Sequence, residues 1–116
     1  MLLDGVLPIG FIIEALQRKA NQEGQSFIIT KRGDHERGSI LVIANDHKGQ
    51  SQLWAQMRDA SGNASWYCPL GLCAQRSLDV SDYARQAAKY DPDIWIIEFD
   101  RPILQNPFEM WLKKLS

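Results

Sequence analysis

Apolar residues recur along the chain with two different periods, and these periods divide it into helices and strands. From about residue 8 to residue 22 they return every three or four positions, which predicts a helix with one apolar stripe. Pro8 suits a first helical turn, and Gly24 can adopt the left-handed conformation that ends a helix. The stripe consists of Ile9, Ile12, Ile13, Leu16 and Ala20.

Continuous apolar runs mark three further segments, at 26–31, 39–45 and 94–99. Because their apolar residues are consecutive, we expect these strands to be covered on both faces and to be central in a sheet. The first two runs are joined by a polar loop that contains Gly33 and Gly38, a pattern typical of a hairpin.

The strand predicted at 51–58 alternates instead, so that one of its faces meets water or a partner. A turn around Ser61 leads to a shorter strand at 64–68, and both strands are expected to be more peripheral. In that hairpin, Gln56 lies opposite Trp66, with Trp54 diagonal on the same face. The two faces carry Leu53, Ala55 and Met57 on one side and Gln52, Trp54 and Gln56 on the other.

Two more helices are predicted. Asp79 can cap the first, which ends before Pro92 and buries Val80, Tyr83, Ala84 and Ala87. The second is a short amphipathic helix at about 106–115, whose apolar stripe is Phe108, Trp111, Leu112 and Leu115. A helix so short is marginal alone, so we expect it to dock on its own sheet or on a second copy, and we favour a homodimer.

These elements predict an α+β fold. It consists of a mostly antiparallel sheet of about five strands, packed with an N-terminal helix, a second helix before the last strand and a short C-terminal helix. No internal repeat or linker divides the 116 residues, which predicts a single domain over 1–116.

Charge and cysteine content narrow the expected partners and compartment. A formal net charge of −1 gives no field to attract nucleic acid or anionic lipid, so we expect neither a nucleic-acid nor a membrane partner. The apolar start lacks the basic residues of a signal peptide and contains Asp4 and Glu14. The two cysteines fit a reducing compartment, so the protein is expected to be cytoplasmic.

Four carboxylates bracket the last apolar run in the segment YDPDIWIIEFD. Asp91 and Asp93 flank Pro92 and are expected in a turn, and Asp100 ends the strand. Glu98 shares a strand face with apolar residues, so it should be partly buried and should contact a cation or backbone hydrogen-bond donors. We expect Glu98 and Arg18 to be structural buried charges, with Lys31 and Arg32 as alternative partners.

Candidate catalytic and metal-binding residues are few. Cys68 and Cys73 supply at most two zinc ligands where a structural site needs four, and the two histidines lie in other loops. No nucleophile, base and orienter set is recognisable, so we expect no catalytic residue, metal or cofactor. The alternative is a small hydrolase or nuclease-like enzyme that uses the acidic end of the 94–99 strand.

Several of these segments together resemble a known family. The turn Lys31-Arg32-Gly33-Asp34, the later Gly38, Arg18 and the downstream block RQAAKYDPDIWIIEFDR are similar to an alphaproteobacterial family catalogued as domain of unknown function 1491. The resemblance covers about 12–101 and implies a small bacterial cytoplasmic protein, but it carries over no catalytic residue. The helix at 106–115 is then an extension of the family-like unit.

Binding is therefore the favoured function, as a non-enzymatic module for an unknown protein or small-molecule partner. The candidate surfaces are the sheet face with Trp54, Gln56 and Trp66, and the C-terminal helix with Phe108, Trp111 and Leu112. The simpler alternative is that a helix covers both indoles, and the usual packing of large aromatic side chains favours it.

Overall fold

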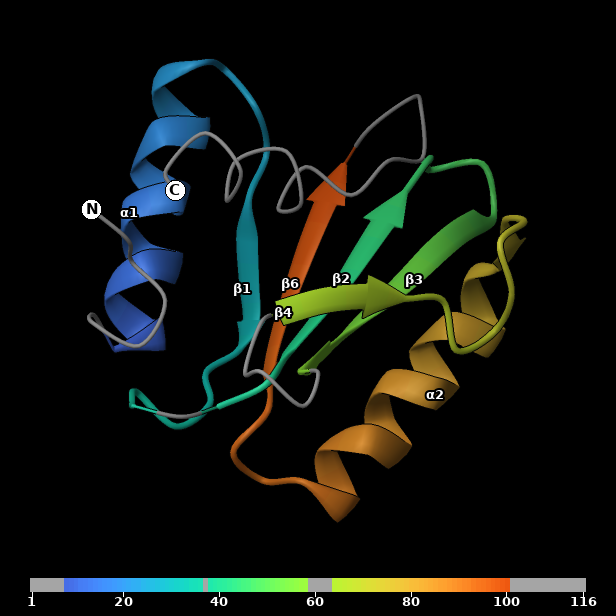
Figure 1. Cartoon of the computed structure of the whole chain (residues 1–116). Helices are drawn as coiled ribbons and strands as arrows, with labels where there is room; N and C mark the ends of the chain where they lie inside the picture. Colours follow the sequence, from blue (N-terminus) through green and yellow to red (C-terminus); the bar gives the residue numbers. More distant parts are fainter. Residues whose placement is uncertain (1–7, 37, 59–63, 101–116) are drawn as a thin grey trace.

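The computed structural model describes residues 8–36, 38–58 and 64–100, which form an α+β fold as predicted (Figure 1). The elements are, in chain order, α1 (Ile9–Gln22), β1 (Ile28–Lys31), β2 (Ile40–Asn45), β3 (Gln50–Arg58), β4 (Ala64–Tyr67), β5 (Gln75–Arg76), α2 (Ser77–Tyr90) and β6 (Trp95–Asp100). The helix predicted at 106–115 lies outside the described residues. Within those ranges, neither helix has the length and apolar character to cross a membrane.

The sheet is mixed, and its last strand lies in its interior. The strand order is β1-β6-β2-β3-β4, and the short β5 pairs with the start of β3. β6 runs antiparallel to β1 and parallel to β2, whereas β3 is antiparallel to both β2 and β4. The expected sheet was mostly antiparallel with about five strands, and the structure adds to it the parallel pairing of β2 with β6 and the short β5.

The predicted hairpin between 26–31 and 39–45 is wrong, because β6 separates the two strands. The central position predicted for 26–31 is also wrong, since β1 lies at the edge of the sheet and Ile28 is 47% exposed. Phe27, the residue before β1, is buried in the α1-side core and attaches this segment to it. The apolar run at 26–31 therefore did not indicate a strand that is buried on both faces. The central positions predicted for 39–45 and 94–99 are confirmed.

Two hydrophobic cores flank the sheet, and consecutive residues of β2 and β6 alternate between them. Val42 and Ile97 belong to the core on the α1 side, whereas Leu41 and Ile96 belong to the core on the α2 side. This division explains why both strands are apolar at successive positions. The α1-side core also contains Ile9, Ile12, Ile13, Leu16, Ala20, Phe27, Ile40, Trp95 and Phe99.

The alternation predicted for β3 is present, but its second face is not open to water throughout. Gln56 is paired with Trp66, as predicted, and Trp54 and Trp66 are partly buried against the α1-side core. Gln52 is only 4% exposed, because its Nε2 donates to the carbonyl of Gly71, 2.9 Å away, in the loop that follows β4.

α2 begins at Ser77, so the prediction that Asp79 caps it is wrong. The helix follows β5 directly, and the Ser77 N–H donates to the Gly49 carbonyl. Asp79 instead lies in the first turn and accepts two hydrogen bonds from Arg76, of 3.0 and 2.9 Å. The side-chain hydrogen bond from Arg76 lowers the pKa of Asp79. The predicted inner face is confirmed for Val80 and Ala84, which are buried.

Candidate functional site

The start of β6 is fixed by close backbone contacts with the loop that follows β1. We call this region, residues 31–36, 38 and 39 with 91–95, the amino-end joint. The Asp34 N–H donates to the Asp93 carbonyl over 2.9 Å, and the Trp95 N–H donates to the Ser39 carbonyl over 2.8 Å. The indole Nε1 of Trp95 also donates to the Asp34 carbonyl, 2.7 Å away. The loop and the strand are therefore joined at successive points.

Two glycines allow this close approach. A Cβ atom at Gly33 would lie 2.1 Å from the carbonyl oxygen of Asp93, and one at Gly38 would lie 2.3 Å from the same oxygen. Both distances are too short for a side chain, because the obstructing atom belongs to the backbone. These glycines therefore let the loop pass against β6 rather than form a hairpin turn.

Lys31 and Arg32, which were expected as partners of Glu98, are both used in the joint. The Lys31 ammonium donates to the carbonyls of Pro92, Ile94 and Arg32 at 2.6, 3.1 and 3.2 Å, which uses all three of its donors. The Arg32 guanidinium lies over the Trp95 ring, 5.3 Å from its centroid, and donates to Glu14 over 2.6 Å.

The two acidic residues at this end lie in a turn, as predicted. Asp91 Oδ1 accepts from the Asp93 N–H over 3.1 Å, and its main-chain carbonyl accepts from the Ile94 N–H over 3.2 Å. Asp91 thus closes the turn between α2 and β6, while Asp93 contributes its backbone carbonyl to the joint. The polar groups of the joint therefore hold a turn in place.

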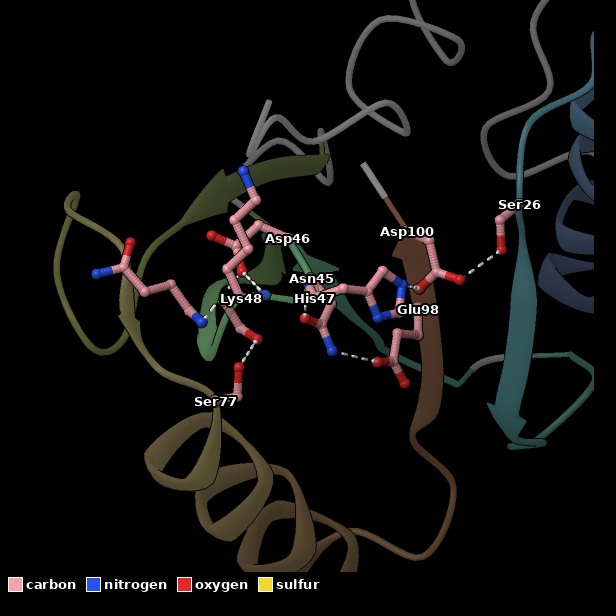
Figure 2. Close-up of polar contacts among 10 residues, drawn as sticks. Ser26, Asn45, Asp46, His47, Lys48, Ser77, Glu98 and Asp100 are labelled. Carbon is pink, nitrogen blue, oxygen red and sulfur yellow. Dashed lines mark hydrogen bonds and ion pairs between the residues drawn. The ribbon is translucent and has the colours of Figure 1, made fainter. Parts of the chain in front are cut away.

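A second group of polar side chains gathers at the opposite end of β6. β2 and β6 are parallel, so their carboxyl ends meet, and Asn45 is paired with Asp100. The segment before β1 reaches the same edge because β1 runs antiparallel to β6. Figure 2 shows the result, which we call the carboxyl-end cluster. It comprises Ser26, Asn45, His47, Glu98 and Asp100.

Asp100 and Asn45 connect the members of the cluster. Asp100 contacts His47 Nε2 through Oδ1 at 2.9 Å and accepts from Ser26 Oγ through Oδ2 at 3.3 Å. Asn45 donates from Nδ2 to Glu98 Oε1 over 3.3 Å, and its Oδ1 accepts from the His47 N–H over 2.8 Å. Each of these two side chains therefore bridges two neighbours.

The turn after β2 directs the imidazole of His47 toward β6 (Figure 2). His47 has a φ of 61°, the one positive φ outside glycine in the described part of the chain. Asp46 Oδ1 holds this turn by accepting from the N–H groups of Lys48 and Gln50, at 2.7 and 3.1 Å. A left-handed backbone at a residue other than glycine is unfavourable by itself, and here the turn compensates for it.

The cluster is open to solvent. The side chains of His47 and Asp100 are 64% and 33% exposed, and Glu98 is half-buried. Glu98 is partly buried, as predicted, but among the described residues its hydrogen-bond donor is the side-chain amide of Asn45 and neither of the expected kinds, a cation or a backbone N–H. Arg18, the other expected buried charge, is exposed on α1.

The order of the contacts limits the chemistry of the cluster. In a hydrolytic triad the imidazole lies between the nucleophile and the carboxylate. Here Asp100 lies between Ser26 and His47, so the hydroxyl donates to the carboxylate and is not activated by the imidazole. Within the described ranges, no group of three or more His, Cys, Asp or Glu side chains is placed to hold a metal ion.

The structure brings three of the sequence-derived site residues together and leaves three undescribed. Trp54, Gln56 and Trp66 lie on the α1 side of β3 and β4, at the register expected. The remaining three, Phe108, Trp111 and Leu112, lie outside the described residues. Sequence reasoning missed Ser26, Asn45 and His47 as a group, since only the parallel pairing of β2 with β6 brings them to Asp100.

Comparisons with known proteins agree on one family. A family model described as "Protein of unknown function (DUF1491)" matches residues 7–109. A crystal structure of a DUF1491 family protein from Caulobacter crescentus CB15 is 30% identical, with a TM-score of 0.72, over 84% of this chain and 90% of that one. An NMR structure of a family protein from the same organism is 32% identical, with a TM-score of 0.71, over 83% and 87%.

A third solved structure shares the fold at lower identity. It is the solution structure of protein Atu0922 from A. tumefaciens, 16% identical with a TM-score of 0.67, over 84% of this chain and 88% of that one. The comparison with curated proteins found no match.

Proposed function

The chain belongs to the DUF1491 family, and from this premise we propose that it is a small non-enzymatic binding or protein-interaction module. The observation that supports the proposal is the carboxyl-end cluster, where three segments distant in sequence converge on one edge of the sheet. Ligands of open sheets with parallel strands bind outside the carboxyl ends of those strands, and by analogy we assign the binding site to this edge.

The contacts inside the cluster favour binding over catalysis. Asp100 and Asn45 are each held at two points, which fixes their positions. Glu98 Oε2 and His47 Nδ1 have no hydrogen-bond partner among the described residues, so both atoms are available to a ligand. The exposure of His47 means that the site does not exclude water, which most catalytic sites do.

The proposal is tested by titrating the full-length ¹⁵N-labelled protein with arginine, glutamate, inorganic phosphate and adenosine monophosphate. We expect at least one of them to cause saturable amide shifts centred on Asn45, His47, Glu98 and Asp100. The double variant His47→Gln/Asp100→Asn should lose these shifts while it keeps the rest of the spectrum. If no compound causes saturable shifts, or if the shifts map elsewhere, the site is wrongly assigned.

One observation favours a second candidate, a small hydrolase at the same edge. The acidic end of β6 is accompanied by an imidazole, and an Asp-oriented histidine is a common general base. The test is hydrolysis of p-nitrophenyl acetate and bis-p-nitrophenyl phosphate. Activity that is lost in His47→Gln but kept in His35→Gln, a change to the other loop histidine, would favour this candidate.

A homodimer and a cytoplasmic location also belong to the proposal. The dimer would use the predicted helix at 106–115 or the Trp54/Trp66 face. Light scattering of the full-length protein and of a chain ending at residue 105 tests it, and a monomer at tens of micromolar would contradict it.

The cytoplasmic location is supported by Cys68 and Cys73, which are both free thiols.

A further inference from the structure

Neither described helix covers the α2-side face of β1 and β6 next to the carboxyl-end cluster. α2 packs against β2, β3 and β5, on the side of the sheet away from β1 (Figure 1), and of β6 it shares a core with Ile96 but not with Glu98. Ile28 of β1 is paired with Glu98 of β6, so their side chains stand together on this face. Ile28 is 47% exposed, and it places an apolar surface directly beside a carboxylate.

The charge of this face is mainly acidic. Asp100 is two residues beyond Glu98 on the same strand and therefore shares its face. Within the described ranges, His47 is the one basic side chain in contact with either carboxylate. The ammonium of Lys31 belongs to the same pair of strands, but carbonyl oxygens of the amino-end joint bind it at the other end of β6.

We propose that this face, formed by Ile28, Asn45, Glu98 and Asp100, binds a lysine or arginine side chain from a basic segment of a partner protein. The charge complementarity supports this occupant, because Glu98 and Asp100 together offer acceptors to a cationic head group. The exposed methyl groups of Ile28 fit the aliphatic stem that both basic side chains carry. The inference rests on the proposed function and specifies its partner class.

The test uses hexalysine as the probe and the full-length ¹⁵N-labelled protein, with hexaglutamate as the charge-reversed peptide. We expect saturable shifts at Ile28, Asn45, Glu98 and Asp100 with hexalysine alone. Glu98→Gln should weaken the affinity about tenfold, the effect of removing one charge-assisted hydrogen bond. Ile28→Thr should weaken it about threefold, because it removes apolar contact but no charge.

The matched control is Asp82→Asn, an exposed acid on α2 that is paired with Arg85. It changes the net charge as much as Glu98→Gln does, and we expect it to leave the affinity for hexalysine unchanged. Equal losses in Asp82→Asn and Glu98→Gln would reduce the binding to general charge attraction and overturn the proposal. Urea unfolding of each variant shows that the fold is retained.

Three other outcomes overturn the proposal. Saturable shifts at the same residues with calcium chloride alone, at a lower concentration than hexalysine requires, would indicate a metal site. Shifts at these same residues that appear on raising the protein concentration alone would indicate a second copy as the occupant. If hexalysine does not bind while a compound of the small-molecule panel still shifts the cluster, the partner class is wrong but the proposed function stands.

Discussion

The two ends of β6 each carry two carboxylates, but the polar groups around them have different partners. At the amino-end joint, backbone groups and the Lys31 ammonium bond to carbonyl oxygens, and two glycines allow contacts too close for a side chain. At the carboxyl-end cluster, side chains bond mostly to other side chains and stay partly exposed. In this protein, acidic residues at a strand end indicate a candidate site only where they do not take part in the hydrogen bonds that hold the backbone.

Part of the family resemblance lies in the first of these two regions. The turn from Lys31 to Asp34, Gly38 and the residues Asp91 to Trp95 all belong to the joint. In this chain these positions maintain the contact between the loop and β6, so this part of the resemblance has an architectural explanation. It transfers the fold, and it gives no information about a ligand.

The largest expected effect is that of a methyl group inside the joint. Gly33→Ala would push Cβ against the Asp93 carbonyl, and we expect it to lower the free energy of unfolding by about 3 kcal/mol. The control is Gly49→Ala near the other end of β6, where φ is 89° but no atom lies within 4 Å. Its expected cost is about 1 kcal/mol, from the left-handed backbone alone. If Gly33→Ala and Gly49→Ala lose equal free energy of unfolding in urea, crowding around Cβ does not distinguish the two regions.

Removing the ammonium of the joint should have the next largest effect. Lys31→Met keeps the aliphatic stem but leaves the carbonyls of Pro92 and Ile94 without this donor. We expect a loss of about 2 kcal/mol, typical of hydrogen bonds to a charged group. Lys89→Met on the exposed face of α2 is the matched control, with no expected change. A Lys31 variant as stable as its control would show that water replaces the ammonium without cost.

The carboxyl-end cluster should tolerate the corresponding changes. His47→Gln and Asp100→Asn break an exposed ion pair, so each should cost less than about 1 kcal/mol in urea unfolding. Both variants should nevertheless lose the ligand-induced shifts. A loss of stability as large as that of Lys31→Met would make the cluster a structural element like the joint.

The smallest effect is expected for Arg76 and Asp79, an exposed pair outside both regions that serves as a baseline. The pKa of Asp79 is lowered by the hydrogen bond from Arg76, so the pair stabilises the fold above the ordinary pKa of 3.8. That stability is lost as the pH falls through the lower folded-state value. Asp79→Asn should leave unfolding at pH 7 nearly unchanged and reduce its acid dependence, as measured by urea unfolding at pH 2 to 7.

Local pattern was sufficient for the parts of the fold that depend on neighbouring residues. It predicted α1, the two-faced burial of β2 and β6, and the register of Gln56 with Trp66. It failed for β1, because the partner of a strand is decided by topology and not by its own residues. The cluster could not be predicted for the same reason, since Ser26, His47 and Asp100 meet only after β6 has entered between β1 and β2.

The position of β6 also has a consequence for biosynthesis. The strand made last among the described elements separates the two strands made first, so two of the five described strand pairings join distant parts of the chain. Such a topology has a high contact order, which slows folding. On the ribosome, the apolar strands β1 and β2 must wait with open edges until Asp100 has emerged. Nascent chains therefore pass through an aggregation-prone stage, in which a chaperone that shields strand edges would raise the yield.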